Sequence, residues 1–452
     1  MFHDTSVAQS IQDDRPLASY MHSRLVQFLR PVLARLALHL DIRLVQTALD
    51  LVQVILTHRH RAIGLLLSEL GGYLLGPNQA PAGTKRISNL VHTNHWSADT
   101  INAVLWQQAS ERVQALHDAG DTVLVVWDGS VWEKPESQAN VDWCPVRSAK
   151  ARRLARRRRG FSLPPSGPPI LVPGLHWDGI AVLGHDGAPT LAHMEWWTTR
   201  GEHATTQREV NQQLLTRCAE AWGACVRHLW DRGYAGSPWV QAAIAARVSF
   251  VVRWKKGNKL LDNWGEERKA WQIARGKRSV SYRLLRDTRS KELSKVGVVA
   301  IPVTLVDHPQ PLWLVVARLG KGREPWYLLT ADRIRTAEDA WTVILAYVRR
   351  WQIELVWRYS KSELAFESLR VVDWEVRRKL LLLATLAYAF LLQLLDPAWE
   401  DLRAFLLRNW CHRSGRRYRA VAAPLYRLRS ALSRLWQTAP PPGLHRPVLN
   451  SG

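Results

Sequence analysis

The sequence predicts an α/β protein in which a mixed β-sheet core lies between helical regions at the two ends of the chain. Residues 122 to 255 alternate between apolar, β-branched runs and amphipathic helical segments. Residues 256 to 335 hold alternating, strand-like segments separated by turns. Residues 20 to 76 have helical periodicity, and the chain from about residue 376 is helical and basic.

The composition favours a polyanionic partner. The 452 residues include 62 Lys and Arg against 39 Asp and Glu, a net charge of +23. Each phosphate that such a protein neutralises releases counterions. Charge alone leaves nucleic acid and acidic lipid open. The four cysteines form no C-x-x-C pair, so neither a disulfide framework nor a zinc site is indicated.

Targeting and membrane signals are not expected. The first residues lack a basic segment followed by an apolar one, so they do not resemble a signal peptide. The longest apolar run, Leu380 to Leu395, includes Thr385 and Gln393 and is shorter than a membrane span, so it predicts a buried helix. We therefore expect a cytoplasmic protein with no membrane partner.

The N-terminal helices are candidates for DNA binding. Residues 20 to 76 predict helices with breaks near Asp41 and at residues 58 to 61, and residues 85 to 120 predict two or three more. Lys85, Arg86, His92 and His95 place cations in the second block. A helical packing domain with a solvated charged edge is the alternative.

The first core strand is the run Thr122 to Trp127, which Asp128-Gly129 is expected to end. An irregular stretch follows at residues 133 to 168. It holds a dense group of cations that we interpret as phosphate contacts rather than as a solvated charge run: Arg147, Lys150, Arg152, Arg153, Arg156, Arg157, Arg158 and Arg159.

The next elements complete the core. Residues 169 to 184 predict two strands with a turn near Asp178-Gly179, and residues 202 to 223 a helix. A strand ending at Asp231, a short helix and the strand SFVVR follow. This is the element order of an RNase H-like fold, in which the first and fourth strands are neighbours. Asp128 and Asp231 are then expected at one end of the sheet.

A helix predicted at residues 337 to 366 carries Tyr347, Arg350, Glu354 and Lys361. At 100° per residue, all four lie within an arc of about 60°. The apolar residues Ile344, Val348, Trp351 and Leu355 are expected to form the buried stripe beside it. Ordinary i,i+4 charge pairing is the simpler interpretation. Composition gives this spacing around any of the 39 acids with a probability of only roughly 2%.

The spacing Y-x-x-R-x-x-x-E-x-x-x-x-x-x-K resembles the signature of DDE transposases of the insertion-sequence-four type, a bacterial family with an RNase H-like catalytic core. The resemblance implies that Tyr347, Arg350 and Lys361 contact phosphates at the transposon end. It also implies that Trp326, in the strand WYLLT, stacks on a base flipped out near the cut. A strand tryptophan belongs as often to a core.

Three carboxylates suit the metal chemistry that the resemblance implies. Asp128, Asp231 and Glu354 are expected to bind Mg²⁺ or Mn²⁺, as two ions, because hard cations prefer oxygen ligands. Two such ions support in-line phosphoryl displacement by water or a 3′-hydroxyl. Taken singly, an Asp at a strand end is more often a turn or cap residue.

The expected domains are a helical DNA-binding region at 1–118, an RNase H-like core at 119–255 and 336–375, a β-rich insertion at 256–335, and a helical basic region at 376–452 suited to dimerisation. The family resembled carries such an insertion just before the Glu354 helix. The basic residues of the last region are His412, Arg413, Arg416, Arg417 and Arg419.

The expected function is that of an insertion-sequence transposase. It cuts both ends of its element and joins them to target DNA, by a cut-and-paste route through a DNA hairpin that only the resemblance implies. The partners are double-stranded DNA, as transposon ends and target, and a second copy of the chain in a synaptic complex. The alternatives are an RNase H-like structure-selective nuclease without strand transfer and a non-catalytic DNA-binding descendant.

Overall fold

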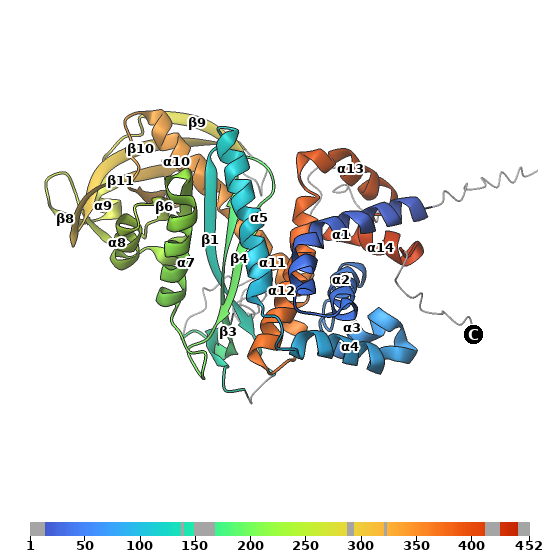
Figure 1. Ribbon diagram of the computed structural model, residues 1–452. Coiled ribbons are helices and arrows are strands. Elements are labelled where there is room, and N and C mark those ends of the chain that lie inside the picture. The colour runs from blue at the N-terminus through green and yellow to red at the C-terminus, as the bar shows by residue number, and fades with distance from the viewer. Residues whose placement is uncertain are drawn as a thin grey trace, which may run out of the picture. The chain divides into compact units, whose positions relative to one another are not determined.

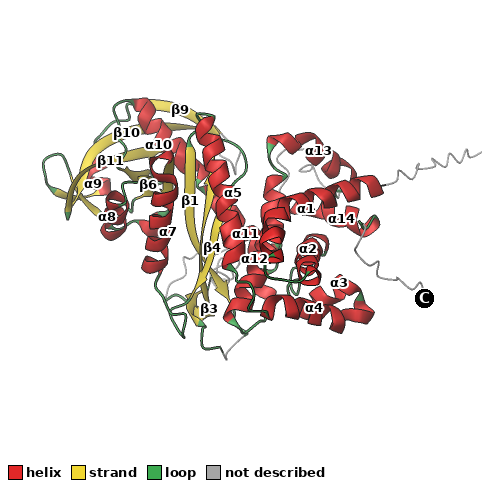
Figure 2. Ribbon diagram, viewed as in Figure 1, coloured by secondary structure: helices red, strands yellow, loops and turns green. Residues whose placement is uncertain are grey.

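The computed structural model describes residues 14–136, 140–148, 168–286, 293–320, 323–411 and 425–441. They fall into two compact units, one of Met1–Ile101 with Tyr359–Gly452 and one of Asn102–Arg358. Figure 2 shows that the described part of the first unit is helical, whereas the second combines a sheet with helices. These units differ from the domains expected from the sequence, which ended the first helical region at residue 118 and kept the C-terminal helices apart.

The helical unit confirms the helices predicted in the N-terminal block. Its longer helices are α1 (Arg15–Ala37), α2 (Ile42–Thr57), α3 (Leu67–Leu75), α4 (Ala80–His92), α12 (Trp374–Gln393), α13 (Glu400–Asn409) and α14 (Leu425–Thr438). Asp41 caps α2 by accepting hydrogen bonds from the N–H groups of Arg43 and Leu44, so the predicted break at Asp41 is a helix start.

Helix α2 lies at the centre of this unit. Its residues from Thr47 to Thr57 are all buried, as expected of a helix surrounded by others. The buried guanidinium of Arg429 on α14 donates to the carbonyl groups of Ile55 and His58. Those carbonyls lie at the C-terminal end of α2, where backbone acceptors lack partners within the helix. The apolar run predicted as a buried helix forms most of α12, which is buried from Lys379 to Leu392 and ends at Gln393.

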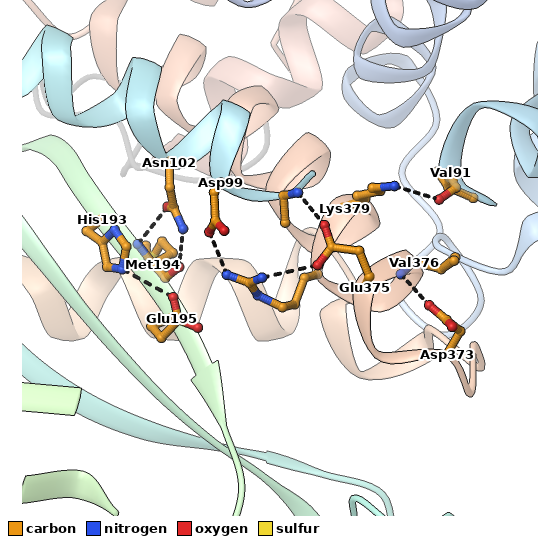
Figure 3. A network of polar contacts seen from close by, with 12 residues as sticks. Val91, Asp99, Asn102, His193, Met194, Glu195, Asp373, Glu375, Val376 and Lys379 are labelled. Atoms are coloured by element: carbon orange, nitrogen blue, oxygen red, sulfur yellow. Dashed lines mark hydrogen bonds and ion pairs between the residues drawn. The ribbon is translucent and has the colours of Figure 1, made fainter. Parts of the chain in front are cut away.

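Polar contacts on α12 fix neighbouring segments of the helical unit (Figure 3). Glu375 accepts from the N–H of Ala98 at 2.5 Å, and Arg378 reaches Asp99 at 2.8 Å. Lys379 donates to the carbonyls of Val91 and Thr93, at 3.2 and 2.8 Å. These charged groups are held by partners, as burial requires.

The second unit is built on a mixed sheet with twelve strands among the described residues. The strands are β1 (Val123–Glu133), β2 (Cys144–Arg147), β3 (Leu171–Leu183), β4 (Thr190–Trp197), β5 (Val226–Trp230), β6 (Ser249–Arg253), β7 (Lys259–Leu261), β8 (Glu267–Lys269), β9 (Ser281–Arg286), β10 (Leu293–Leu305), β11 (His308–Arg318) and β12 (Trp326–Thr330). The main path is β2-β3-β1-β5-β6-β12-β11-β10-β7-β8, with β4 beside β3 and β9 beside β10. The predicted neighbours, the first and fourth core strands, are β1 and β5, which pair in parallel.

Two predictions within the core were wrong. Residues 171 to 183 form the single strand β3, with no turn at Asp178-Gly179. The third core strand is instead β4, in a stretch that the sequence interpretation treated as a polar connection. The outer edge of β4 is covered by Asn102, which exchanges two hydrogen bonds with the backbone of Met194 at 3.0 and 3.2 Å (Figure 3). Covering an edge in this way prevents pairing with other chains.

Helices α5 (Asp99–Asp118) and α7 (Gln207–Trp222) cover one face of the core strands (Figure 1). Their rings Trp106 and Trp222 stack at 4.4 Å, and apolar residues of both helices join the core with β1 and β3. Thr206 and Glu209 form a capping box at the start of α7. The remaining helices of this unit are α8 (Ser237–Ala245), α9 (Ala270–Ala274), α10 (Ala337–Arg349) and most of α11 (Trp351–Ser362).

The strands predicted between residues 256 and 335 are confirmed as β9 to β12. They extend the core sheet, because β12 pairs antiparallel with β6 through Leu329 and Val252. The turn between β10 and β11 lies at Val306 and Asp307, one residue earlier than expected, and His308 and Pro309 already belong to β11.

Among the described residues, no single helix is long and apolar enough to cross a membrane. The pair Trp374–Gln393 and Pro397–Asn409, bent by 80°, meets the length and composition criteria only when taken together.

Candidate functional site

Asp128 lies within β1 and not at its end, contrary to the sequence interpretation. The strand continues to Glu133 because it remains paired with β3, where Asp128 faces Gly179. Its parallel pairing with β5, however, stops at Val126 and Leu229. Asp128 therefore lies just past the point where β5 stops pairing with β1. Its carboxylate accepts a hydrogen bond from the N–H of Gly129 at 3.0 Å.

Asp231 follows the last residue of β5. Continuing the β1–β5 register by two residues places Asp231 level with Asp128. Its carboxylate accepts from the N–H of Gly233 at 2.6 Å and caps the short 3₁₀ turn Arg232–Tyr234. A β-carbon at Gly233 would lie 2.8 Å from that carboxylate, so the turn requires glycine.

The predicted helix at residues 337 to 366 is two helices that meet at Arg350. Helix α10 ends at Arg349 and α11 runs from Trp351 to Ser362. At the junction Arg350 N–H bonds to Tyr347 and Ile353 N–H to Arg350, both i to i−3. Such tighter turns end one helix and begin the next. The predicted helix also stops four residues early.

Although the helix breaks at Arg350, the side chains of Tyr347, Arg350 and Glu354 remain neighbours. Arg350 forms an ion pair with Glu354 through one terminal nitrogen, and its guanidinium carbon lies 5.6 Å from the centre of the Tyr347 ring. Only 7% of Arg350 is exposed, yet its Nε and other terminal nitrogen make no hydrogen bond to the described residues. Burial lowers the pKa of Arg350, but Tyr347, Asp128 and Glu354 outweigh it and raise the pKa.

Two of the predicted carboxylates, Asp231 and Glu354, act electrostatically on the third, Asp128. Burial raises the pKa of Asp128 to about 7; Arg350 opposes this rise, while Asp231 and Glu354 add to it. The pKa of the buried Tyr234 is also raised, by burial and then by Asp178, Asp128 and Asp231. Like charges brought close disfavour ionisation of each other. The structure thus brings Asp128, Asp231 and Glu354 within interaction range.

A metal site is supported by the donor chemistry more than by the present arrangement. Carboxylate oxygens are the ligands of hard divalent cations, and such a cation favours the charged form of Asp128, whose pKa is raised by burial and, to a smaller extent, by Asp231 and Glu354. Within the described ranges, however, no group of three His, Cys, Asp or Glu side chains is arranged to hold a metal ion. Glu354 is turned to Arg350, and Asp231 to Gly233.

A pocket of about 320 Å³ has in its lining Arg350, whose guanidinium pairs with Glu354. Tyr347 and Trp326 meet in it edge to face at 5.4 Å. The guanidinium of Arg253 lies 5.6 Å from the Trp326 ring. The buried hydroxyl of Tyr347 interacts with the guanidinium groups of Arg350 and Arg253. This combination of cations and aromatic rings suits a nucleotide.

The stripe expected to be buried on this helix was partly wrong. Ile344 is buried, but Val348 and Trp351 are 38% and 39% exposed and line the pocket. Tyr347 is buried instead. Helical periodicity placed all four apolar residues in the core, but Val348 and Trp351 form part of the pocket wall.

Asp178 is a buried carboxyl that the sequence interpretation missed. It faces Gly129 across β3 and β1, and one oxygen accepts a hydrogen bond from the indole N–H of Trp197. Burial raises the pKa of Asp178 to about 6. The sequence feature that could have revealed it is the pair Asp178-Gly179, which was interpreted as a turn. In fact Gly129 leaves room for Asp178, whose oxygen would lie 2.6 Å from an added β-carbon.

Three groups of predicted residues are not placed at this site. Lys361 lies in the last turn of α11, which belongs there to the helical unit. Arg156, Arg157, Arg158 and Arg159 lie outside the described residues, as do the basic residues from 412 to 419.

Comparison with known proteins points to DNA transposition. Residues 205–390 match a family model described as "Transposase DDE domain"; this span includes Asp231 and Glu354 but not Asp128. No curated protein matches. The chain is similar to the cryo-EM structure of a piggyBac transposase synaptic complex with hairpin DNA, at 11% identity and a TM-score of 0.40, over 98% of this chain and 85% of that one. The family match supports a DDE transposase.

Proposed function

We propose that this protein is an insertion-sequence transposase that cuts the ends of its element and joins them to target DNA. One observation carries the proposal: Asp128, Asp231 and Glu354, from three distant parts of the sequence, act on one electrostatic centre. The match to a transposase DDE domain agrees with it. We further propose that the core is RNase H-like, which the order β4-β3-β1-β5-β6 supports, with residues 256–335 as its insertion.

In this proposal the carboxylates of Asp128, Asp231 and Glu354 hold Mg²⁺ or Mn²⁺, as two ions. When bound, the metal supplies Lewis-acid stabilisation of charge on the phosphoryl oxygens. The residues themselves fix the centre to rigid elements, two on neighbouring strands and one on a helix. Glu354 would exchange its contact with Arg350 for the metal.

Arg350, once released from Glu354, has donors for a DNA phosphate. Two of its buried nitrogens make no hydrogen bond of ordinary geometry within the described part of the chain, and the Tyr347 ring lies beside them. A buried donor without a partner is costly, so these groups are suited to a ligand that supplies acceptors. Trp326, in the lining of the pocket, would offer an aromatic surface for a base displaced from the duplex. We also propose that Lys361 and Arg156–Arg159 contact DNA phosphates, because their side chains are positively charged.

The other parts of the proposal concern assembly. The helices of residues 1–118 would bind the transposon ends, and two copies of the chain would pair the ends in a synaptic complex. The bacterial cytoplasm, at the nucleoid, is the corresponding location. A cut-and-paste route through a DNA hairpin is the form that we expect.

The test is cleavage of DNA that carries the element's own ends, with Mg²⁺ or Mn²⁺. Wild type is compared with Glu354→Gln and with Asp332→Asn as a matched control. Asp332 pairs with Arg227 at 2.8 Å, at the opposite end of β5 from Asp231. Nicking followed by joined products, lost only in Glu354→Gln, supports the transposase.

Other outcomes assign other functions. Cleavage without joining would indicate a structure-selective nuclease. Salt-sensitive DNA binding with no cleavage by any variant would indicate a DNA-binding descendant. Equal activity of wild type and Glu354→Gln would refute the proposed centre.

A further inference from the structure

Glu324 joins two cations at the rim of the site. Its carboxylate lies 3.0 Å from the Lys256 ammonium through one oxygen and 3.8 Å from the Arg232 guanidinium through the other. The hydrogen bond from Lys256 lowers the pKa of Glu324, and the charges of Arg232 and Arg253 lower it further. Glu324 is thus ionised at neutral pH among three cations.

These cations come from separate segments that meet beside the proposed centre. Arg232 directly follows Asp231, and Arg253 ends β6. Lys256 lies in the turn after β6, and Glu324 lies two residues before Trp326. Arg253 in turn lies against the Trp326 ring. The cluster therefore adjoins the surface to which we assign a displaced base.

The positive charge of this cluster is larger than the single negative charge of Glu324. Three positive groups surround one carboxylate, and Arg232 and Lys256 are 51% and 65% exposed. Exposed ion pairs of this kind contribute little to stability. A phosphodiester also has one negative charge and two terminal oxygens, so it can occupy the place of the carboxylate between the same cations.

We propose that Arg232, Arg253 and Lys256 form a binding site for a phosphate of the DNA strand that passes Trp326, and that Glu324 fills this site until DNA displaces it. The inference rests on the proposed function, since it takes DNA to be the ligand. Glu324 is then an internal competitor: its contacts must break before the phosphate binds. Its removal should therefore tighten DNA binding.

The experiment measures the affinity of the full-length protein for a fluorescein-labelled duplex, without divalent metal, over a range of salt concentrations. The chain offers a matched control in the ion pair Lys259–Glu267, at 2.7 Å. Glu267 and Glu324 are both 42% exposed, so Glu267→Gln and Glu324→Gln change the net charge equally at similar surfaces. Thermal unfolding checks that each variant is folded.

Glu324→Gln is expected to tighten binding roughly two- to five-fold at low salt, and Glu267→Gln to change it far less. Lys256→Gln should weaken binding and reduce the slope of log affinity against log salt by about 0.9, the value for one phosphate contact with duplex DNA. Lys259→Gln should leave the slope unchanged. In the double variant of Lys256 and Glu324, the gain from Glu324→Gln should shrink.

Equal tightening by Glu324→Gln and Glu267→Gln would overturn the inference, because net charge would explain both. Weaker binding by a folded Glu324→Gln would overturn it as well, since Glu324 would then assist binding. In both cases DNA binding by the wild type would leave the proposed function standing. A wild type without salt-dependent DNA binding would refute both together.

Discussion

Replacing Asp128 by Asn should stabilise the metal-free protein at high pH. The substitution keeps the size of the side chain and removes a charge that burial disfavours most; Asp231 and Glu354 also disfavour it, while Arg350 favours it. Functional sites often hold such a group at some cost in stability. The substitution therefore tests the environment of Asp128 without DNA.

The pH dependence follows from the two pKa values of Asp128. Its pKa is about 7 in the folded protein, against an ordinary value of 3.8. Between these values the folded state holds a proton that the unfolded chain has released. The free energy of unfolding therefore falls as pH rises from about 4 to about 7, and stays lower above that range. A difference of about three pKa units corresponds to about 4 kcal/mol.

The assay is thermal unfolding of wild type and Asp128→Asn at pH 5 and pH 8, without divalent metal. At pH 8 the variant should melt at least about 4 °C higher, with a much smaller gain at pH 5. Asp332→Asn is the control, and it should melt lower at both pH values because Arg227 loses its partner. An Asp128→Asn variant that melts at or below wild type at pH 8 would refute the reasoning.

Three further substitutions probe the surroundings of the centre. Gly129→Ala should lower the free energy of unfolding by about 1–3 kcal/mol in urea, because its β-carbon would meet Asp178; Gly257→Ala, which meets nothing within 4 Å, should be neutral. Tyr347→Phe should lower DNA-end cleavage while reducing the free energy of unfolding in urea by no more than about 1.5 kcal/mol, the contribution of one ordinary hydrogen bond, since the hydroxyl interacts with Arg350 and Arg253. A larger loss of stability with unchanged cleavage would contradict a role in DNA contact. Trp326→Ala should slow cleavage of a matched duplex more than of one mismatched at the cut, where unstacking costs less; equal slowing would contradict base stacking there.

The sequence predicted the helices and most strands because those features are local. Apolar runs and periodicity mark β1, β5 and β6, and the Tyr347–Arg350–Glu354 spacing lies on consecutive turns. The two Asp-Gly pairs were wrongly interpreted as a strand end and a turn, and the structure gives the physical reason. Asp128-Gly129 and Asp178-Gly179 lie opposite each other in antiparallel strands, where glycine serves close packing. Gly179 leaves room for the Trp357 ring, which would lie 2.5 Å from an added β-carbon.

The features that escaped prediction depend on long-range contacts. Arg232 follows β5, Arg253 and Lys256 lie at and after the end of β6, and Glu324 precedes β12. The pairing of β6 with both β5 and β12 brings these segments together. Nor does periodicity distinguish a buried face from the wall of a pocket, so the exposure of Val348 and Trp351 could not be foreseen. The break at Arg350 likewise follows from backbone hydrogen bonds that no residue type there demands.

The central claim is that Asp128, Asp231 and Glu354 hold one metal centre. The most direct measurement replaces Mg²⁺ by Fe²⁺ and adds ascorbate and hydrogen peroxide, so that radicals formed at the bound iron cut the nearby backbone. The account predicts cuts next to all three residues in wild type, suppressed by excess Mg²⁺ and absent in Asp128→Asn. Cuts near only one of the three, or the same pattern in Asp128→Asn, would contradict it.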